Sequence, residues 1–236
     1  ADIAGGVNYF LWDKSNKTEC EVTNVINNVK YSSSRNLNEF NTFVRFNQAI
    51  PIIRKVFNVQ ENGKTLENVV SPQKPFGLPT NYKPKDKGVP CWFIQKIGKR
   101  YADLKDIHDE NKLLNKWKLL VPRSPIAGQT DFTKPVGFYY DGNTNIAKPG
   151  ECCTESFIVA GAFDTEEEVK NFKSYLFTKT VRFLLLQAVV SQDVLRNKFC
   201  FVPDLGKYDR IYTDKYLCEK WNITDDEWKY IDSRIK

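Results

Sequence analysis

The sequence predicts an α+β fold, a small mixed sheet with helices packed around it and a β-hairpin in front of it. Three observations predict this fold. Residues 1–31 combine strand-type residues with period-two alternation, the middle third alternates strand-like runs with turn-rich loops, and the final third carries helix start signals. Segregated runs of strands and helices along a chain are typical of α+β proteins.

The hairpin is expected between residues 5–14 (GGVNYFLWDK) and residues 20–31 (CEVTNVINNVKY), with a turn at residues 13–17. Residues 36–58 then place apolar side chains at mostly helical spacing, with Asn36 or Asn38 as the candidate cap and Pro51 as the point where two helices divide. A further helical turn is expected before Ser71, where a Pro/Gly-rich loop begins.

Strands are expected in residues 89–98, 117–124 and 155–163, separated by long loops at 125–137 and 140–151. Residues 164–168 (DTEEE) have the cap and acidic first turn that begin a helix, and the apolar run to Val190 predicts one long helix. Two short helices are expected from Thr213 and Thr224, the second with Trp228 and Ile231 on its core face.

Composition excludes several classes of protein. At 236 residues and 41% hydrophobic content, the chain can bury one sizeable core or two small ones. Its longest apolar stretch, residues 183–190, is interrupted by Gln187 and is shorter than the roughly 20 residues that span a bilayer, so no membrane span is expected. The chain begins with Ala1 and is expected to be part of a longer protein.

Cysteine and histidine usage predicts neither a metal site nor a catalytic triad. The six cysteines contain no CxxC pair, and free thiols in a cytoplasmic protein are expected; Cys152-Cys153 is interpreted as two free thiols at a loop-to-strand junction, with a vicinal disulfide as the alternative. The single histidine, His108, lies in a polar run and is expected at the surface.

The positive charge is uneven. The net charge is +6, and between Lys83 and Lys118 bases outnumber acids. Basic residues there alternate with Tyr82, Trp92, Phe93 and Tyr101; they are Lys83, Lys85, Lys87, Lys96, Lys99, Arg100 and Lys105. Phosphate contacts combined with base or sugar packing need this pattern. A solvated lysine-rich surface is the alternative, and the sequence leaves both open.

Several strings occur in an order that resembles one family. They are GGVNYFLWDK, NLNEFNTFVRFNQAI, VVSPQKPFGLPTN, WKLLVPRS, CTESFIVAGAFDTEEEVKNFKSYLFTKTVRFLL, FVPDL and ITDDEWKYIDSRI. Together they span almost the whole chain and are similar to the C-terminal part of adenine-specific DNA methyltransferases of Type II and Type IIG restriction-modification systems. The resemblance implies that residues 1–35, with the hairpin, are a remnant of the Rossmann-like catalytic domain, and that residues 36–236 are the target recognition domain.

The resemblance also implies the partners. They are double-stranded DNA and the methyltransferase catalytic domain of the full-length protein, which would bind S-adenosylmethionine. The family's chemistry uses a Gly-rich cofactor loop and an Asn/Asp-Pro-Pro-aromatic tetrapeptide that holds the flipped adenine. This chain has no Pro-Pro step, and Gly5-Gly6 is a lone pair. No catalytic residue, metal ligand or cofactor is therefore expected in this chain.

The candidate DNA contacts come from loops and one helix. Lys74 and Phe76 lie in a loop that Pro75 and Gly77 shape, with a buried Phe76 as the alternative. Arg123 follows a strand and could bind guanine with two hydrogen bonds, whereas a lysine more often binds phosphate. For Lys179 and Arg182 the alternative is a core helix with outward-snorkelling bases. The full set is Lys74, Phe76, Lys83, Lys85, Arg123, Lys134, Lys148, Lys179 and Arg182.

Two alternatives belong to other functional classes. Pro203-Asp204 with Glu227-Trp228-Lys229 matches the PD…ExK pattern of magnesium-dependent nucleases. That pattern requires ExK on a strand, whereas residues 227–229 follow a Thr224 cap and are predicted to be helical. The other alternative is a protein-interaction domain, in which the basic loops only solvate the fold.

Overall fold

The computed structural model describes residues 9–15, 18–26, 28–60, 63–94, 97–126, 128–129 and 131–236. The fold is α+β, as the sequence predicts. The helices are α1 (Ala49–Val59), α2 (Glu166–Phe177), α3 (Lys179–Ala188), α4 (Asp214–Lys220) and α5 (Asp225–Arg234), with short 3-10 turns η1 (Leu66–Asn68), η3 (Leu104–Asp106) and η4 (Arg196–Phe201). No helix in these ranges is long and apolar enough to cross a bilayer.

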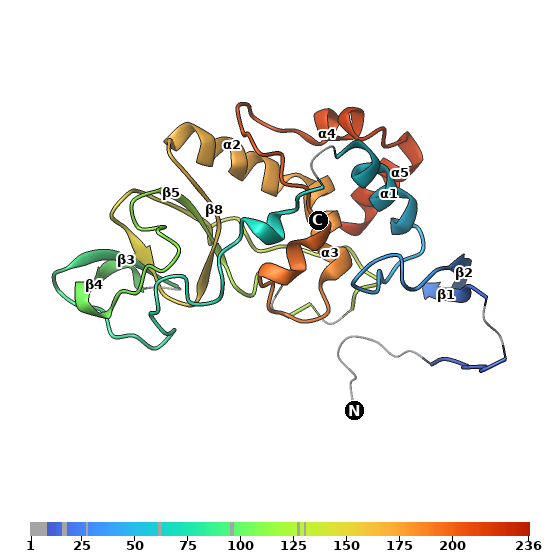
Figure 1. Cartoon of the computed structure of the whole chain (residues 1–236), viewed down its shortest axis with the longest axis horizontal. Helices are drawn as coiled ribbons and strands as arrows, with labels where there is room; N and C mark the ends of the chain where they lie inside the picture. Colours follow the sequence, from blue (N-terminus) through green and yellow to red (C-terminus); the bar gives the residue numbers. More distant parts are fainter. Residues whose placement is uncertain are drawn as a thin grey trace.

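The strands form small separate sheets. They are β1 (Cys20–Ile26), β2 (Val29–Arg35), β3 (Val89–Phe93), β4 (Gly98–Ala102), β5 (Trp117–Pro122), β6 (Asn145–Ala147), β7 (Cys152–Cys153) and β8 (Phe157–Phe163). The hairpin β1–β2 stands alone, the second sheet has the order β4-β3-β7, and the third has the order β6-β5-β8. Because β3 pairs antiparallel with β4 and parallel with β7, the second sheet is mixed. In Figure 1, β3 and β4 lie at the end opposite to α1, α4 and α5, and the β1–β2 hairpin lies below α1 at the helical end.

Strands β5 and β8 separate two hydrophobic cores. Leu119 and Ile158 face the larger core, which the helices complete, while Leu120 and Val159 face a smaller core beneath β3 and β7. Successive side chains of a strand point to opposite faces, so this alternation places a core on each side of the sheet. Both strands are therefore buried on both faces, and that burial accounts for their continuous apolar sequences.

Threonine caps begin the C-terminal helices as predicted. The Thr165 side chain accepts from the backbone N of Glu168, and Thr224 accepts in the same way from Glu227, each in a capping box. Thr213 caps α4. Ile231 is fully buried, and Trp228 packs against the larger core, as predicted.

The single long helix predicted to reach Val190 is wrong. The helix is interrupted at Thr178, whose backbone is extended (φ −63°, ψ 148°), and a second helix, α3, starts at the next residue. The Thr178 side chain then accepts from the backbone N of Val181 at 3.3 Å, which caps α3.

Two further predictions need correction. Residues 36–48 form turns, not a first helix, and Pro51 lies in the first turn of α1, where its missing N–H removes no hydrogen bond. The hairpin lies further along the chain than expected, because β1 and β2 both fall within residues 20–35. Residues 9–13 are irregular, and residues 5–8 lie outside the described part.

All six cysteines are free, as predicted, including Cys152 and Cys153, which are fully buried in β7.

Candidate nucleic-acid interface

The predicted basic run folds onto one edge of the second sheet. The backbone N of Lys85 donates to the carbonyl O of Tyr101 at 2.9 Å, which forms an antiparallel bridge. Residues 83–87 thereby lie beside residues 99–101 on the free side of β4. Gly88 permits this approach, since a Cβ there would lie 2.2 Å from the carbonyl O of Ala102. We call Lys83, Lys85, Lys87, Arg100 and Tyr101 the basic edge.

The cations of the basic edge are exposed and form no ion pair with the described residues. Within the described part of the chain, no carboxylate lies within ion-pair distance of the basic-edge lysines or of Arg100. Lys85 Nζ lies 5.8 Å from the ring centroid of Tyr82, and Tyr101 is 40% exposed. The edge therefore presents positive charge together with the exposed ring of Tyr101, whereas Phe93, which the sequence pattern also predicted for this surface, is buried in the smaller core.

The surroundings of the basic edge contain some negative charge. Asp86 and Asp103 line a shallow pocket with Lys85 and Lys87. The backbone N–H of Lys105 donates to Asp103 and lowers the pKa of this carboxyl. Lys99 differs from its neighbours because it forms an ion pair with Glu151 and lies 5.2 Å from the centroid of the Trp92 ring. Lys96 lies outside the described residues.

A second group of predicted contacts converges on Glu155, in the turn between β7 and β8. Arg123 Nη1 donates to Glu155 Oε1 at 3.0 Å, and Lys74 Nζ lies 3.3 Å from Glu155 Oε2. Arg123 Nε also lies 3.5 Å from Asp193 Oδ2. We call Lys74, Arg123, Glu155 and Asp193 the Arg123 cluster. It has equal numbers of positive and negative groups, so it adds no net charge to the surface.

The loop that carries Lys74 is rooted in the smaller core. Phe76 is fully buried there, which confirms the buried alternative, so its ring is not accessible to a base. Lys74 has a left-handed backbone (φ +58°), and Gly77 (φ +74°) leaves room for His108, whose side chain would contact any Cβ at that position. His108 itself is exposed, as predicted. The buried phenylalanine fixes the position from which Lys74 reaches Glu155.

The remaining predicted contacts are dispersed. Lys134 pairs with Asp131 at 3.4 Å, and Lys179 pairs with Asp232 at 2.5 Å. Arg182 is half-buried on α3, and burial lowers its pKa. Lys148 is exposed and forms no ion pair with the described residues. β4 lies at the opposite end of the molecule from α5, so Lys85 and Lys179 do not share one local surface (Figure 1).

The nuclease pattern does not assemble into a metal site. Residues 227–229 lie on α5 and not on a strand, as the capping argument predicts. Glu227 accepts from the Thr224 backbone and binds Lys55 Nζ at 2.6 Å, so its carboxylate has structural partners. In the described ranges no group of three or more histidine, cysteine or acidic residues could hold a metal ion.

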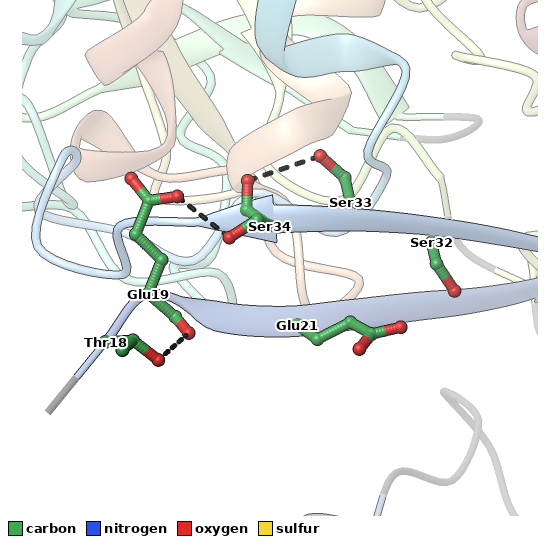
Figure 2. A pocket seen from close by; sticks show the side chains of 6 residues that line it. All are labelled: Thr18, Glu19, Glu21, Ser32, Ser33 and Ser34. Carbon is green, nitrogen blue, oxygen red and sulfur yellow. Dashed lines mark hydrogen bonds between the residues drawn. The ribbon is translucent and has the colours of Figure 1, made fainter. Parts of the chain in front are cut away.

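A hydroxyl-rich pocket lies on the β1–β2 hairpin and was not predicted. Figure 2 shows Ser34 directing its hydroxyl to Glu19, where it donates to Oε2 at 2.8 Å, while Ser33 reaches the Ser34 carbonyl. Glu21 faces the same shallow pocket. Two carboxylates repel phosphate, so we do not include this surface in the candidate interface.

Comparisons with protein-family models, with curated proteins and with solved structures found no match.

Lys85, Lys74 and Arg123 were predicted from the sequence, but Glu155 and Asp193 were not. These two acids are far from Arg123 in sequence and carry no local motif. The serine that follows Glu155 and the valine that follows Asp193 bond to the Arg123 backbone, and this pairing could not be read from spacing.

Proposed function

We propose that this chain binds double-stranded DNA and recognises its sequence, as the target recognition region of an adenine-specific DNA methyltransferase in a restriction-modification system. The observation that carries the proposal is the basic edge. Two basic segments that are separated in sequence meet on one sheet edge, and Lys83, Lys85, Lys87 and Arg100 have no described carboxylate partner. Exposed cations without ion-pair partners beside an aromatic ring are suited to phosphate and sugar contacts.

In this proposal the basic edge supplies affinity, and the catalytic domain of the full-length protein supplies chemistry. That domain would bind S-adenosylmethionine and the flipped adenine, because this sequence contains neither of the motifs that hold them. Residues 1–35 would belong to the end of that domain, and residues 36–236 would be the recognition domain. The family resemblance of the sequence strings supports this division.

The test is the salt dependence of duplex binding by the whole chain. Its affinity for a random 20–30 bp duplex should fall linearly with salt on logarithmic axes, because each bound phosphate releases a counterion. Alanine at Lys83, Lys85 or Lys87 should each reduce the slope by about one if that lysine contacts phosphate. Lys220→Ala is the matched control, because Lys220 is an exposed lysine at the end of α4.

An equal loss of slope in Lys220→Ala would show that the binding is non-local, and the basic edge would not be the interface. Salt-insensitive binding, or no binding, would contradict the proposal altogether. The protein-interaction alternative would then account better for the basic loops.

A further inference from the structure

The backbone of Arg123 is fixed from two sides. Its N–H donates to the carbonyl O of Ser156 at 2.9 Å, and its own carbonyl accepts from the backbone N of Val194 at 2.8 Å. Ser156 belongs to the turn that leads into β8, and Val194 belongs to the connection between α3 and η4. The residue that ends β5 is therefore held between two separate segments of chain.

Carboxylates from the same two segments hold the Arg123 side chain. Glu155, which precedes Ser156, accepts from Nη1 at 3.0 Å; Asp193, which precedes Val194, lies 3.5 Å from Nε. Each backbone contact thus brings its neighbouring carboxylate to the guanidinium. The side chain is 27% exposed, so this arrangement lies at the surface and not in the core.

The two carboxylates are themselves held in place. Glu155 Oε1 also accepts from Gln73 Nε2 at 2.9 Å, and its Oε2 faces Lys74 Nζ at 3.3 Å. Asp193 Oδ1 accepts from the Ser124 hydroxyl. Lys74 adopts a left-handed backbone to reach this position, which is a costly conformation for a residue with a Cβ.

One edge of the guanidinium makes no hydrogen bond. Nη1 donates to Glu155 and Nε lies nearest to Asp193, while Nη2 donates no hydrogen bond to the residues that the structure describes. Nη2 and the second N–H of Nη1 form a pair of adjacent donors. A pair of donors on one guanidinium matches the O6 and N7 acceptors of guanine in the major groove.

We propose, on the basis of the DNA-binding function above, that Arg123 reads one guanine and that Glu155 and Asp193 are positioning residues that aim its free edge. A guanidinium that is already oriented loses less rotamer entropy when it binds. Because the cluster is neutral, it contributes base preference and not phosphate attraction. The basic edge and the Arg123 cluster therefore have separable functions.

Selection from a randomised duplex library tests this division. The unmodified chain should enrich a motif that contains a preferred guanine, and Arg123→Ala should remove the preference at one position, by about tenfold or more. Arg123→Lys should lose the same preference while it keeps the salt slope, since lysine retains the charge but not the paired donors.

The positioning role is tested with Glu155→Gln and Asp193→Asn, which keep size and remove charge. Each should weaken the preference at the same guanine position and leave the rest of the motif and the salt slope unchanged. The control is Glu166→Gln on α2, which removes an exposed carboxylate that pairs with Lys170 at 2.8 Å. It should not change the motif.

The outcomes separate the two proposals. If the unmodified chain binds duplex but Glu155→Gln and Asp193→Asn keep the full motif, positioning is overturned, even when both variants melt at lower temperature, and the proposed function stands. If Arg123→Ala weakens random and selected duplexes equally, Arg123 is a phosphate contact and the inference is overturned. If the unmodified chain binds no duplex, both proposals are overturned.

Discussion

Asn24 and Asn47 join the β1–β2 hairpin to the helical body: Asn24 Oδ1 accepts the backbone N–H of Asn47 at 2.7 Å. Asn47 Nδ2 in turn donates to the carbonyl O of Val22 in β1 and of Tyr31 in β2, at 2.7 and 2.8 Å. One amide group thus binds both strands. An isolated two-stranded hairpin is at best marginally stable, so these bonds are expected to determine whether this one is ordered.

Asn47→Ala should release the hairpin from the body. Losing the shared amide would remove two hydrogen bonds to strand carbonyls, at about 1–3 kcal/mol, and would raise the equilibrium constant for opening of β1 and β2 by about 5- to 160-fold. The more frequent opening should appear as faster hydrogen exchange of the β1 and β2 amides. Thr23→Ala is the control, because the Thr23 hydroxyl bonds the Ser32 hydroxyl on the exposed hairpin surface and does not reach the helical body. Equal exchange in the two variants would contradict the prediction.

Thr178→Ala should weaken the junction between α2 and α3. The Thr178 hydroxyl accepts from Val181 N and donates to the carbonyl O of Tyr175 at 2.8 Å, so the change removes the cap of one helix and a contact with the other. Loss of a threonine cap costs about 1–2 kcal/mol of unfolding free energy. Urea denaturation should show this loss, and Thr178→Ser, which keeps the hydroxyl, should recover most of it.

The sequence predicted those elements that local chemistry determines. The capping boxes at Thr165 and Thr224 need only residues three positions apart, and both are present in the structure. Strands β5 and β8 were recognisable because burial on both faces makes them continuous apolar runs.

Elements that depend on distant partners were not predictable. Neither glycine nor proline occurs around Thr178, and threonine, although a favoured N-cap residue, also occurs inside helices, so the break was not marked clearly. The start of α3 is set by Asp214, which accepts from the backbone N of Lys179 at 3.1 Å and of Thr180 at 2.8 Å. The Arg123 cluster has the same origin, because Glu155 and Asp193 reach Arg123 only through tertiary contacts.

Glu227→Gln should affect stability and not magnesium chemistry. Glu227 closes the capping box of α5 and binds Lys55 at 2.6 Å, so removing its charge should cost roughly 0.5–2 kcal/mol of unfolding free energy. Neither this variant nor Asp204→Ala should change the result of a plasmid-nicking assay with Mg²⁺. Loss of nicking in both variants, with folding intact, would restore the nuclease alternative.

Lys118 is a fully buried lysine on β5, on the strand face that carries Leu120 and the smaller core. Its Nζ donates to the carbonyl O atoms of Leu114 at 3.0 Å, Lys116 at 2.6 Å and Lys148 at 3.1 Å. Burial lowers its pKa from the ordinary 10.5 to about 8. Below this value the ammonium is charged in the folded and unfolded states alike, so the cost of burying the charge is present in full.

Raising the pH should therefore remove a destabilising contribution of Lys118. Above about pH 8 the folded chain releases this proton, while the unfolded chain retains it until about pH 10.5. The unfolded state then binds more protons, so the unfolding free energy rises with pH. This increase should reach about 2 kcal/mol by about pH 9.5. Denaturant unfolding of the unmodified chain and of Lys118→Met at both ends of this range measures it.

The comparison between the two proteins isolates Lys118. A hydrogen bond with the Cys152 thiol raises the pKa of Cys91, and burial raises the pKa of Cys153. Both thiols therefore reduce the unfolding free energy as the pH rises, but they do so in both proteins. The difference in unfolding free energy should therefore move in favour of the unmodified chain as the pH rises. A difference that stays constant across the range would mean that Lys118 keeps an ordinary pKa, with the three carbonyl hydrogen bonds fully offsetting its burial.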